Sequence, residues 1–217
     1  SSKPQQGAVL IDSSTISYSD SKEFSINAQK HGVLAYDAPV SGGIYGAANA
    51  SLTFMVGSDN KENFEKAQEF LNYMGKKIIH CGDHGAGQIF KMCNNLVLGI
   101  TNAGLSESLS LGKQLGVNIN LMCEVLANST ATCWPLNVNC VVPGVKPDSP
   151  SSKDYQGGFS NELIEKDMKL AIENSNKIKG DLKLGKIAHK YYDNIIREGD
   201  GKKDFGILYK YKLDNKL

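Results

Sequence analysis

A long segment with helical apolar periodicity begins in the stretch Gly85–Asn95 and continues to about Leu115, where Gly116 ends it. Its apolar residues recur at the spacing of one helix face: Ile89, Met92, Cys93, Leu96, Val97, Ile100 and Ala103. We therefore predict a long helix that turns this face toward a core. Lys91 and Asn95 lie one turn apart on another side of the helix, so we expect both to face outward, toward a cleft or toward water.

Before this helix, short apolar runs have the length and composition of buried strands: Ala8–Ile11, Val33–Tyr36, Leu52–Val56 and Lys77–His80. The pattern between the first two predicts a helix over about Ser19–Lys30, with Phe24 and Ala28 inward. After the third run, Asp59 and Glu62 resemble a capping box, and Gly75 is the predicted stop. The core face of that helix is predicted at Phe64, Ala67, Leu71 and Met74. The order βαββαβ with mixed strands is typical of the second half of a dinucleotide-binding domain.

A glycine-rich segment follows the second predicted strand. Gly43–Ala47 resembles the end of a dinucleotide fingerprint, but the first glycine is missing and Ser41 takes its place. Only Ala47–Ala50 separates the segment from the next strand, which is too short for the crossover helix of a βαβ unit. We therefore predict a loop. It is either an ordinary turn or a cradle whose N–H groups and Ser41 hydroxyl hold a carboxylate or phosphate.

From residue 85 onward all the predicted regular elements are helices. Further helices are predicted at Leu121–Ala127, after the cap residue Ser160, and at Leu184–Arg197 and Asp204–Tyr211, whereas Trp134–Phe159 is irregular. The predicted fold class is thus α/β plus all-α. Residues 1–84 form the C-terminal part of a Rossmann-like dinucleotide-binding domain, and residues 85–217 form a mostly helical domain for substrate binding and dimerisation.

Charge and cysteine content argue against several classes of protein. The 24 Lys and Arg nearly balance the 23 Asp and Glu, so neither nucleic acid nor an anionic membrane is an expected partner. The five cysteines include no C-x-x-C pair, which is typical of a reducing compartment. The segment His80–His84 contains possible metal ligands, but nothing distant completes a set of four, so no metal is predicted.

Four motifs occur in a characteristic order: Asp37–Gly43, Leu52–Gly57, Gly85-x-Gly87-x-x-x-Lys91-x-x-Asn94-Asn95, and Tyr155–Phe159 with Lys166-Asp167. Together they resemble the 3-hydroxyisobutyrate dehydrogenases, a branch of the β-hydroxyacid dehydrogenase family, over nearly the whole chain. One departure is Ala50-Ser51, where the family usually has a glycine before Leu52. The other departure is at the N-terminal end. The family's dinucleotide fingerprint lies upstream of Ser1, so we expect the first half of the cofactor domain to be absent from this chain.

The resemblance implies a set of site residues: Lys91 is catalytic, Ser41, Gly42, Gly43 and Asn95 hold the substrate, and Thr15 and Lys166 contact the cofactor. The implied reaction is the NAD-dependent oxidation of 3-hydroxyisobutyrate to methylmalonate semialdehyde, a step of valine catabolism in the mitochondrial matrix. Lys91 would be the general acid/base of this reaction. The choice between NAD and NADP is made by the missing half of the cofactor domain.

Other functions fit parts of the same pattern. A reductase of a related semialdehyde acid is the nearest alternative, and a 6-phosphogluconate-type decarboxylating enzyme is disfavoured because no basic cluster for a phosphate is evident. A non-catalytic helical dimerisation module is the third, since the chain lacks the turn that binds pyrophosphate. We expect the chain by itself to be inactive, and we expect its helical part to share a core with a second copy, in a homodimer or higher homo-oligomer.

Overall fold

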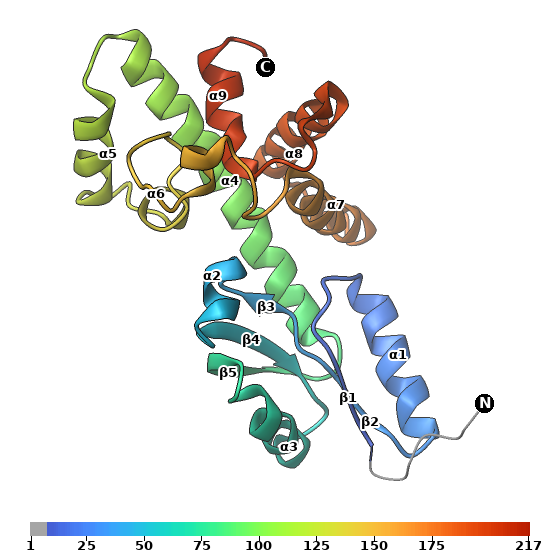
Figure 1. Ribbon diagram of the computed structural model, residues 1–217. Helices are drawn as coiled ribbons and strands as arrows, with labels where there is room; N and C mark the ends of the chain where they lie inside the picture. The colour runs from blue at the N-terminus through green and yellow to red at the C-terminus, as the bar shows by residue number, and fades with distance from the viewer. Residues whose placement is uncertain (1–7) are drawn as a thin grey trace. The chain divides into compact units, whose positions relative to one another are not determined.

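The computed structural model describes residues 8–217 and divides into two compact units, Ser1–Asn94 and Asn95–Leu217 (Figure 1). The first unit contains a mixed sheet with helices, and the second is built from helices and irregular segments. The predicted succession of an α/β part and a mostly helical part is therefore confirmed. The predicted domain boundary after residue 84 stays a prediction.

Within residues 8–94, the sheet of the first unit has five strands: β1 (Val9–Asp12), β2 (Leu34–Asp37), β3 (Val40–Ser41), β4 (Leu52–Gly57) and β5 (Gly75–Gly82). β1 pairs with β2 in parallel and β4 pairs with β5 in parallel, whereas β4 is antiparallel to both β2 and β3. The sheet is thus mixed, as predicted. β3 is an additional strand whose length of two residues is too short to carry a sequence pattern.

The helices of the first unit are α1 (Tyr18–Lys30), α2 (Gly43–Ala48) and α3 (Lys61–Leu71). α1 packs against β2, and α3 packs against β4 and β5 (Figure 1). The prediction of a loop at the glycine-rich segment is wrong, because α2 forms there. Gly42 precedes this helix with a φ of 136°, a conformation that favours glycine, and the helix ends in two alanines, the residue with the highest helix propensity.

The predicted inner face of α1 is wrong at Phe24, whereas Ala28, the other residue predicted to face inward, is half-buried. Phe24 is 44% exposed, and the buried residues of the helix are Ser21 and Ser25. The Ser25 hydroxyl donates a hydrogen bond to the backbone oxygen of Ser21 at 3.1 Å. Small residues whose hydroxyl bonds within the helix itself can thus take the place that the apolar periodicity assigned to a phenylalanine.

The start and end of α3 differ from the prediction by one or a few residues. Asn60, not Asp59, is the N-cap, and its side-chain oxygen accepts from the backbone N–H of Asn63 at 2.9 Å. The helix ends before Gly75, which is the first residue of β5. Met74 is therefore outside the helix and 47% exposed, while the other predicted core residues, Phe64, Ala67 and Leu71, are buried.

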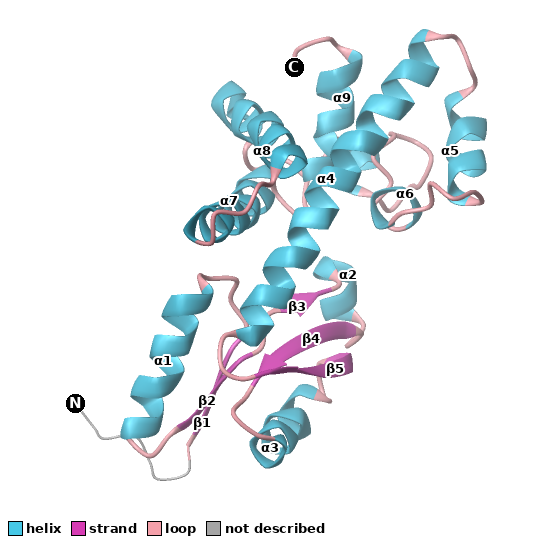
Figure 2. Ribbon diagram, turned by 180° about the vertical axis from the view of Figure 1, so that it is seen from behind, coloured by secondary structure: helices cyan, strands magenta, loops and turns pink. Residues whose placement is uncertain are grey.

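The remaining helices are α4 (Ala86–Gln114), α5 (Ile119–Ala127), α6 (Trp134–Asn137), α7 (Asn161–Lys177), α8 (Lys183–Ile195) and α9 (Leu208–Leu213). α7 and α8 lie side by side, as Figure 2 shows. Shorter turns are η1 (Pro150–Lys153), η2 (Ile196–Asp200) and η3 (Phe205–Ile207). None of the helices between residues 8 and 217 combines the length and hydropathy that crossing a bilayer requires.

Only part of the predicted apolar stripe of α4 is buried: Ala103 lies in the core and Leu96 and Ile100 pack against it, but a polar side of the helix is buried as well. Val97 is 63% exposed, whereas Asn95 is 1% exposed and Asn102 is fully buried. The prediction that Asn95 faces outward is therefore wrong. The polar side is buried because other helices supply partners for it, as when the Asn102 side-chain NH₂ donates to the Tyr192 hydroxyl at 3.0 Å. A buried amide with such partners avoids most of its desolvation penalty.

One buried carboxylate organises the irregular region between α6 and α7. Asp204, 1% exposed, accepts hydrogen bonds at 2.9 Å from the side-chain NH₂ of Asn139 and from the backbone N–H groups of Phe159 and Gly206. Gly158 has a φ of 70°, and a Cβ there would lie 2.2 Å from a carboxylate oxygen of Asp204. Burial is the main cause that raises the pKa of Asp204 to about 6, against the opposing effect of these hydrogen bonds.

We expect Asp204 to make stability depend on pH between about pH 4 and 6. Its folded-state pKa of about 6 lies above the ordinary value for an unfolded chain, about 3.9. The native state therefore binds a proton in this window that the unfolded state has lost. Stability from this group is fully present below about pH 4 and is lost as the pH rises through about 6, by about 3 kcal/mol in all.

The measurement is chemical denaturation of the wild type and Asp204→Asn at a series of pH values. The asparagine side chain of the variant cannot ionise, so the unfolding free energy of the wild type relative to the variant should decrease across this window. A difference that stays constant from pH 4 to 7 would show that Asp204 titrates normally.

Candidate functional site

The first turn of α4 is fixed by the carboxylate that ends β2. Asp37, 1% exposed, accepts hydrogen bonds from the backbone N–H of Gly85 at 2.7 Å and of Gln88 at 3.2 Å. Burial raises the pKa of Asp37, and these two hydrogen bonds partly offset the effect. An acceptor at this position satisfies amides that a helix leaves without intrahelical partners. The start of the helix that carries Lys91 is thus tied to the sheet.

Gln88 connects the same turn to the segment after β1. Its side-chain NH₂ donates to the backbone oxygen of Ser14 at 2.9 Å, and its side-chain oxygen accepts from the backbone N–H of Ile16 at 3.2 Å. These two bonds hold the backbone on both sides of Thr15, the predicted cofactor contact. Gln88 is 1% exposed, so a buried side chain, not a surface residue, makes these hydrogen bonds to the loop.

The predicted substrate-binding turn lies between β3 and α2. Ser41 is the last residue of β3, Gly42 is the N-cap of α2, and Gly43 is its first residue. Both glycines have positive φ, 136° and 63°, and a Cβ on Gly42 would approach the Leu52 side chain to 3.2 Å. The turn therefore needs glycine for its conformation at both positions and for its contact at Gly42.

Lys91 lies on α4, three residues after Gln88 and just beyond the first turn of that helix. Its side chain is half-buried. Asn95 follows one turn later on the same helix. A lysine whose stem is partly covered and whose amine can reach out of the helix is able to donate or accept a proton at a bound oxygen.

Asn95 and Lys166 meet at one carboxylate in the second unit. The side-chain NH₂ of Asn95 donates to Asp167 Oδ2 at 2.5 Å, and Lys166 Nζ lies 3.0 Å from Asp167 Oδ1. The Asp167 side chain is 3% exposed, whereas that of Lys166 is 44% exposed. Asp167 thus orients the Asn95 amide, with its NH₂ group toward α7 and its oxygen pointing away from that carboxylate. It also holds Lys166 by a charge-assisted contact.

The structure connects some of the predicted site residues in two groups, each within one unit. Thr15 is linked through Gln88 to the turn of α4 that precedes Lys91, and Asn95 is linked through Asp167 to Lys166. The predicted roles of all these residues stay predictions. The sequence pattern assigns no role to Gln88 or Asp167. The sequence signals that could have identified them are their positions: Gln88 directly follows Gly87, and Asp167 directly follows Lys166, a predicted cofactor contact.

No group of three or more His, Cys, Asp or Glu side chains among residues 8–217 is arranged to hold a metal ion. The possible ligands between His80 and His84 have other contacts. His80 Nε2 lies 3.1 Å from the Ser58 backbone oxygen, and His84 Nε2 lies 2.9 Å from Gln29 Nε2.

Truncation of Asp167 should damage both the fold and the site. In Asp167→Ala the Asn95 NH₂ is left buried without the carboxylate, so we expect a loss of about 1–3 kcal/mol in the free energy of unfolding. Denaturation and substrate affinity are measured for Asp167→Ala beside Lys169→Ala, an exposed residue of the same helix for which we expect a change within about 0.5 kcal/mol. Equal effects of the two substitutions would remove Asp167 from this arrangement.

Comparison with known proteins places this arrangement in a family. A family model described as "NAD-binding of NADP-dependent 3-hydroxyisobutyrate dehydrogenase" matches residues 85–212. The chain belongs to the 3-hydroxyisobutyrate dehydrogenase family. A second model, "NAD binding domain of 6-phosphogluconate dehydrogenase", matches residues 1–82. Both models describe NAD-binding parts of dehydrogenases, and the predicted membership is confirmed.

Individual members of the family are similar over most of the chain. It is 42% identical to the probable mitochondrial 3-hydroxyisobutyrate dehydrogenase of Dictyostelium discoideum, covering 96% of this chain and 65% of that protein. It is 41% identical to the human mitochondrial enzyme, covering 96% of this chain and 62% of that protein. The chain therefore spans somewhat less than two thirds of the length of these curated relatives.

A solved structure, the Mycobacterium tuberculosis 3-hydroxyisobutyrate dehydrogenase with L-serine, superimposes with a TM-score of 0.87 at 38% identity. The match covers 95% of this chain and 70% of that one. The 3-hydroxyisobutyrate dehydrogenase ygbJ of Salmonella typhimurium, at 23% identity and a TM-score of 0.83, shares the fold.

Proposed function

We propose that this chain carries the catalytic lysine and the substrate-binding residues of an NAD-dependent dehydrogenase that oxidises 3-hydroxyisobutyrate to methylmalonate semialdehyde. The observation that carries the proposal is the buried Asp167 carboxylate, which contacts both Asn95 and Lys166 in a segment that matches the family. Asn95 lies one helical turn from Lys91 on α4. The contact with Asp167 gives the amide and the cation fixed positions, which a surface helix without such a partner would not provide.

The residues after β1 fit a nicotinamide dinucleotide. β1 and β2 are parallel and in register from Val9 with Leu34 to Asp12 with Asp37, so their carboxyl ends meet at one edge of the sheet. Dinucleotides bind outside the carboxyl ends of strands in folds of this kind. Thr15 lies in the segment that Gln88 holds at this edge, and its hydroxyl can bond to an amide or ribose oxygen.

The chemistry that NAD supplies when bound is acceptance of a hydride from the alcohol carbon. The protein has to remove the hydroxyl proton and to hold the carboxylate of the substrate. We assign the removal of this proton to the amine of Lys91, which accepts it from the hydroxyl oxygen as the carbonyl forms. Asn95 would orient that oxygen, and Ser41 with the N–H groups of Gly42 and Gly43 would bind the carboxylate.

Ser41→Ala should weaken the hold on substrate more than it slows the chemistry. A hydroxyl that bonds to a charged carboxylate contributes about 1.5–3 kcal/mol, so KM should rise about tenfold or more in the full-length protein while kcat changes less. Ser51→Ala is a matched control, since Ser51 is also half-buried and its hydroxyl bonds to the backbone oxygen of Gly46 in α2. If Ser41→Ala changed NAD affinity alone, the turn would belong to the cofactor.

Two experiments test the function as a whole. Thermal-shift titration of the full-length protein with NAD and NADP separates a dehydrogenase from a non-catalytic helical module, because only the melting temperature of the former rises as the cofactor concentration is increased. A substrate panel then compares 3-hydroxyisobutyrate with related hydroxy acids, their semialdehydes and 6-phosphogluconate. The proposal requires the highest kcat/KM for 3-hydroxyisobutyrate, and a preference for 6-phosphogluconate would contradict it.

We further propose a place in valine catabolism in the mitochondrial matrix, supported by the mitochondrial names of the relatives.

We also propose that the protein forms a homodimer or higher oligomer through its helical part. This assembly would bury apolar side chains on α4, on α5 and in the short segment after α4 that are more than half exposed: Leu111, Leu121, Val125 and Leu115. Light scattering on the full-length protein measures this state. A monomer at micromolar concentration would exclude it.

A further inference from the structure

The turn between α7 and α8 and the outer face of α8 expose apolar side chains that the proposed reaction does not use. Three large aliphatic side chains there are more than half exposed: Ile178, Leu184 and Ile187. Ile178 is the C-cap of α7, and the other two lie one turn apart near the start of α8. Within the second unit, α4 runs between this helix pair on one side and α5 and α6 on the other (Figure 1). The exposed group is therefore separate from the apolar side chains of α5.

Lysines surround these aliphatic side chains. The stretch from residue 177 to residue 190 contains five: Lys177, Lys179, Lys183, Lys186 and Lys190. Asp181 is the one acid in that stretch, and its carboxylate oxygens lie 3.4 Å from Lys183 Nζ and 3.9 Å from Lys186 Nζ. One aspartate cannot neutralise five ammonium groups, so this surface keeps a positive charge. The near balance of charge over the whole chain hides this local excess.

Basic and apolar side chains share one face of α8. The spacing i, i+3, i+4 and i+7 places four residues on one side of the helix: Lys183, Lys186, Ile187 and Lys190. The other side of the helix is buried and carries Gly185, Ala188, Tyr192 and Ile195. The outer face thus combines cations on long stems with aliphatic tips, which is the composition of helices that lie on a membrane surface.

The backbone at Lys179 supports a use for its side chain. This residue follows the C-cap of α7 with a φ of 59°, in the left-handed region that favours glycine. The Gly180 N–H donates to the Ser175 backbone oxygen at 2.8 Å, which closes the helix end as in a Schellman motif. Glycine is the usual residue at the position of Lys179, so the lysine makes the fold less stable. Backbone strain of this kind is concentrated at functional sites.

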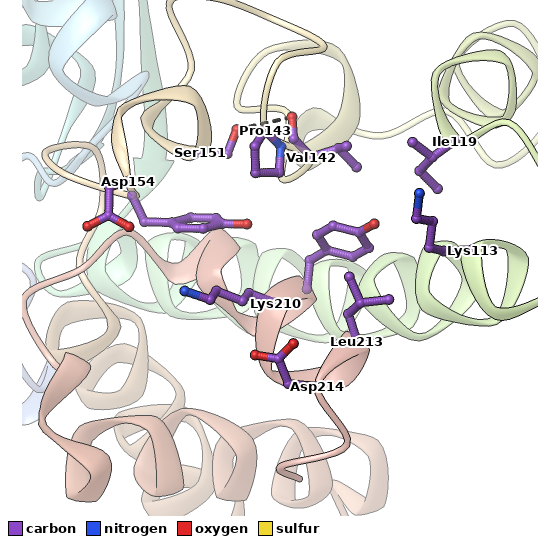
Figure 3. Close-up of a pocket in the computed structure, with 11 residues that line it drawn as sticks. Lys113, Ile119, Val142, Pro143, Ser151, Asp154, Lys210, Leu213 and Asp214 are labelled. Atoms are coloured by element: carbon purple, nitrogen blue, oxygen red, sulfur yellow. Dashed lines mark hydrogen bonds between the residues drawn. The ribbon is translucent and has the colours of Figure 1, made fainter.

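The pocket of the second unit differs from this surface in charge. Figure 3 shows Lys113 and Lys210 beside a cavity of about 560 Å³ that Asp154 and Asp214 also line. Two lysines accompany two carboxylates there, so the lining carries no net charge. Around the turn between α7 and α8 the lysines outnumber the acids by five to one. Only the second surface therefore favours an anionic partner.

We propose that the turn between α7 and α8, with the outer face of α8, binds the surface of a membrane that contains anionic phospholipids. The lysine ammonium groups contact headgroup phosphates, and the three aliphatic side chains enter the boundary between headgroups and acyl chains. A second copy of the chain fits this surface less well, because a two-fold contact would set lysines against lysines. The expectation of no membrane partner used the charge of the whole chain, which does not describe this local surface.

The test is co-sedimentation of the full-length protein with phospholipid vesicles. We expect binding to phosphatidylcholine vesicles with about 30% phosphatidylglycerol to be at least about tenfold tighter than binding to phosphatidylcholine alone. This binding should weaken by about tenfold or more when the salt concentration rises from about 0.1 M to about 0.5 M, because salt screens the lysines. Equal binding to the two kinds of vesicle would overturn the proposal. Binding to neither would also overturn it and would leave an acidic protein as the partner.

Lys179→Gly should bind anionic vesicles more weakly and yet be more stable. Loss of one lysine weakens the binding by about fivefold, and relief of the left-handed backbone lowers the unfolding equilibrium constant by about fivefold. Lys153→Gly is the control, since this exposed lysine of η1 lies outside the stretch and its loss changes the net charge equally. Its vesicle binding should stay within about twofold of the wild type.

Ile178→Ser tests the apolar part of the surface. The side chain is exposed, so the fold should survive, whereas vesicle binding should weaken by about tenfold because one aliphatic group no longer enters the membrane. Circular dichroism checks the fold of each variant, and co-sedimentation measures the binding. Unchanged affinity in either Lys179→Gly or Ile178→Ser would overturn the proposal, and so would an equal loss in Lys153→Gly.

Discussion

Replacement of Lys91 by alanine in the full-length protein should lower kcat/KM by about 10²- to 10⁴-fold, the usual contribution of a general acid/base. The fold should survive, because Lys91 is only half-buried and alanine favours a helix more than lysine does. Steady-state kinetics and circular dichroism of the variant provide the two measurements.

Lys113→Ala is the matched control for this prediction. Lys113 lies on the same helix near its C-terminal end, is exposed, and belongs to none of the predicted site residues. Its removal changes the net charge by the same amount, so a loss of activity seen only at Lys91 cannot come from general electrostatics. Near-normal turnover of Lys91→Ala would take this lysine out of the mechanism.

Gly87→Ala should destabilise the protein by about 3 kcal/mol or more, at the upper end of what overpacking costs. A Cβ at this position would lie 2.2 Å from the backbone oxygen of Met55 and 2.8 Å from a carboxylate oxygen of Asp37. Neither atom can move aside cheaply, since the first belongs to strand β4 and the second holds the first turn of α4.

Gly104→Ala gives the opposite prediction on the same helix. Its added Cβ would have no neighbouring heavy atom within 4 Å, so the gain in helix propensity should stabilise the protein by about 0.5–1 kcal/mol. Chemical denaturation of the two variants beside the wild type measures both changes. If Gly87→Ala were as stable as Gly104→Ala, the close contact between α4 and the sheet would not exist.

The sequence predicted most elements because their signals are local. The apolar runs at Val33–Tyr36 and Leu52–Val56 coincide with β2 and β4 almost residue for residue. Gly116, with a φ of 83°, stands just beyond the end of α4, as a C-terminal glycine should. Ser160 caps α7 by accepting from the backbone N–H of Leu163. Each of these features depends on a few consecutive residues.

The predictions that failed on α4 depend on partners far along the chain. Asn95 was predicted to face outward, yet it is buried because Asp167, in α7, supplies its acceptor. Asn102 is buried for the same kind of reason, with Tyr192 of α8 as its partner. Apolar periodicity could not identify this face, since its residues are polar and only tertiary hydrogen bonds make their burial favourable.

The candidate site could also be predicted only in part. The sequence motifs identify Ser41, Lys91 and Lys166 as candidate site residues, but they do not show what holds these residues in place. Asp37, Gln88 and Asp167 hold neighbouring groups in position, and only the structure shows their contacts. Gly87 is explained by the same contacts, because the close approach of α4 to Met55 leaves no room for a side chain.

The most direct test of the proposed dehydrogenase is to follow the hydrogen that leaves the alcohol carbon. The full-length protein is incubated with NAD and 3-hydroxyisobutyrate that carries deuterium on this carbon, and both products are analysed by mass spectrometry. We expect deuterium in the reduced cofactor and an equal amount of methylmalonate semialdehyde trapped as its hydrazone, and with Lys91→Ala we expect both products to form at least about 10²-fold more slowly. Reduced cofactor without deuterium, or release of carbon dioxide in place of the semialdehyde, would contradict it.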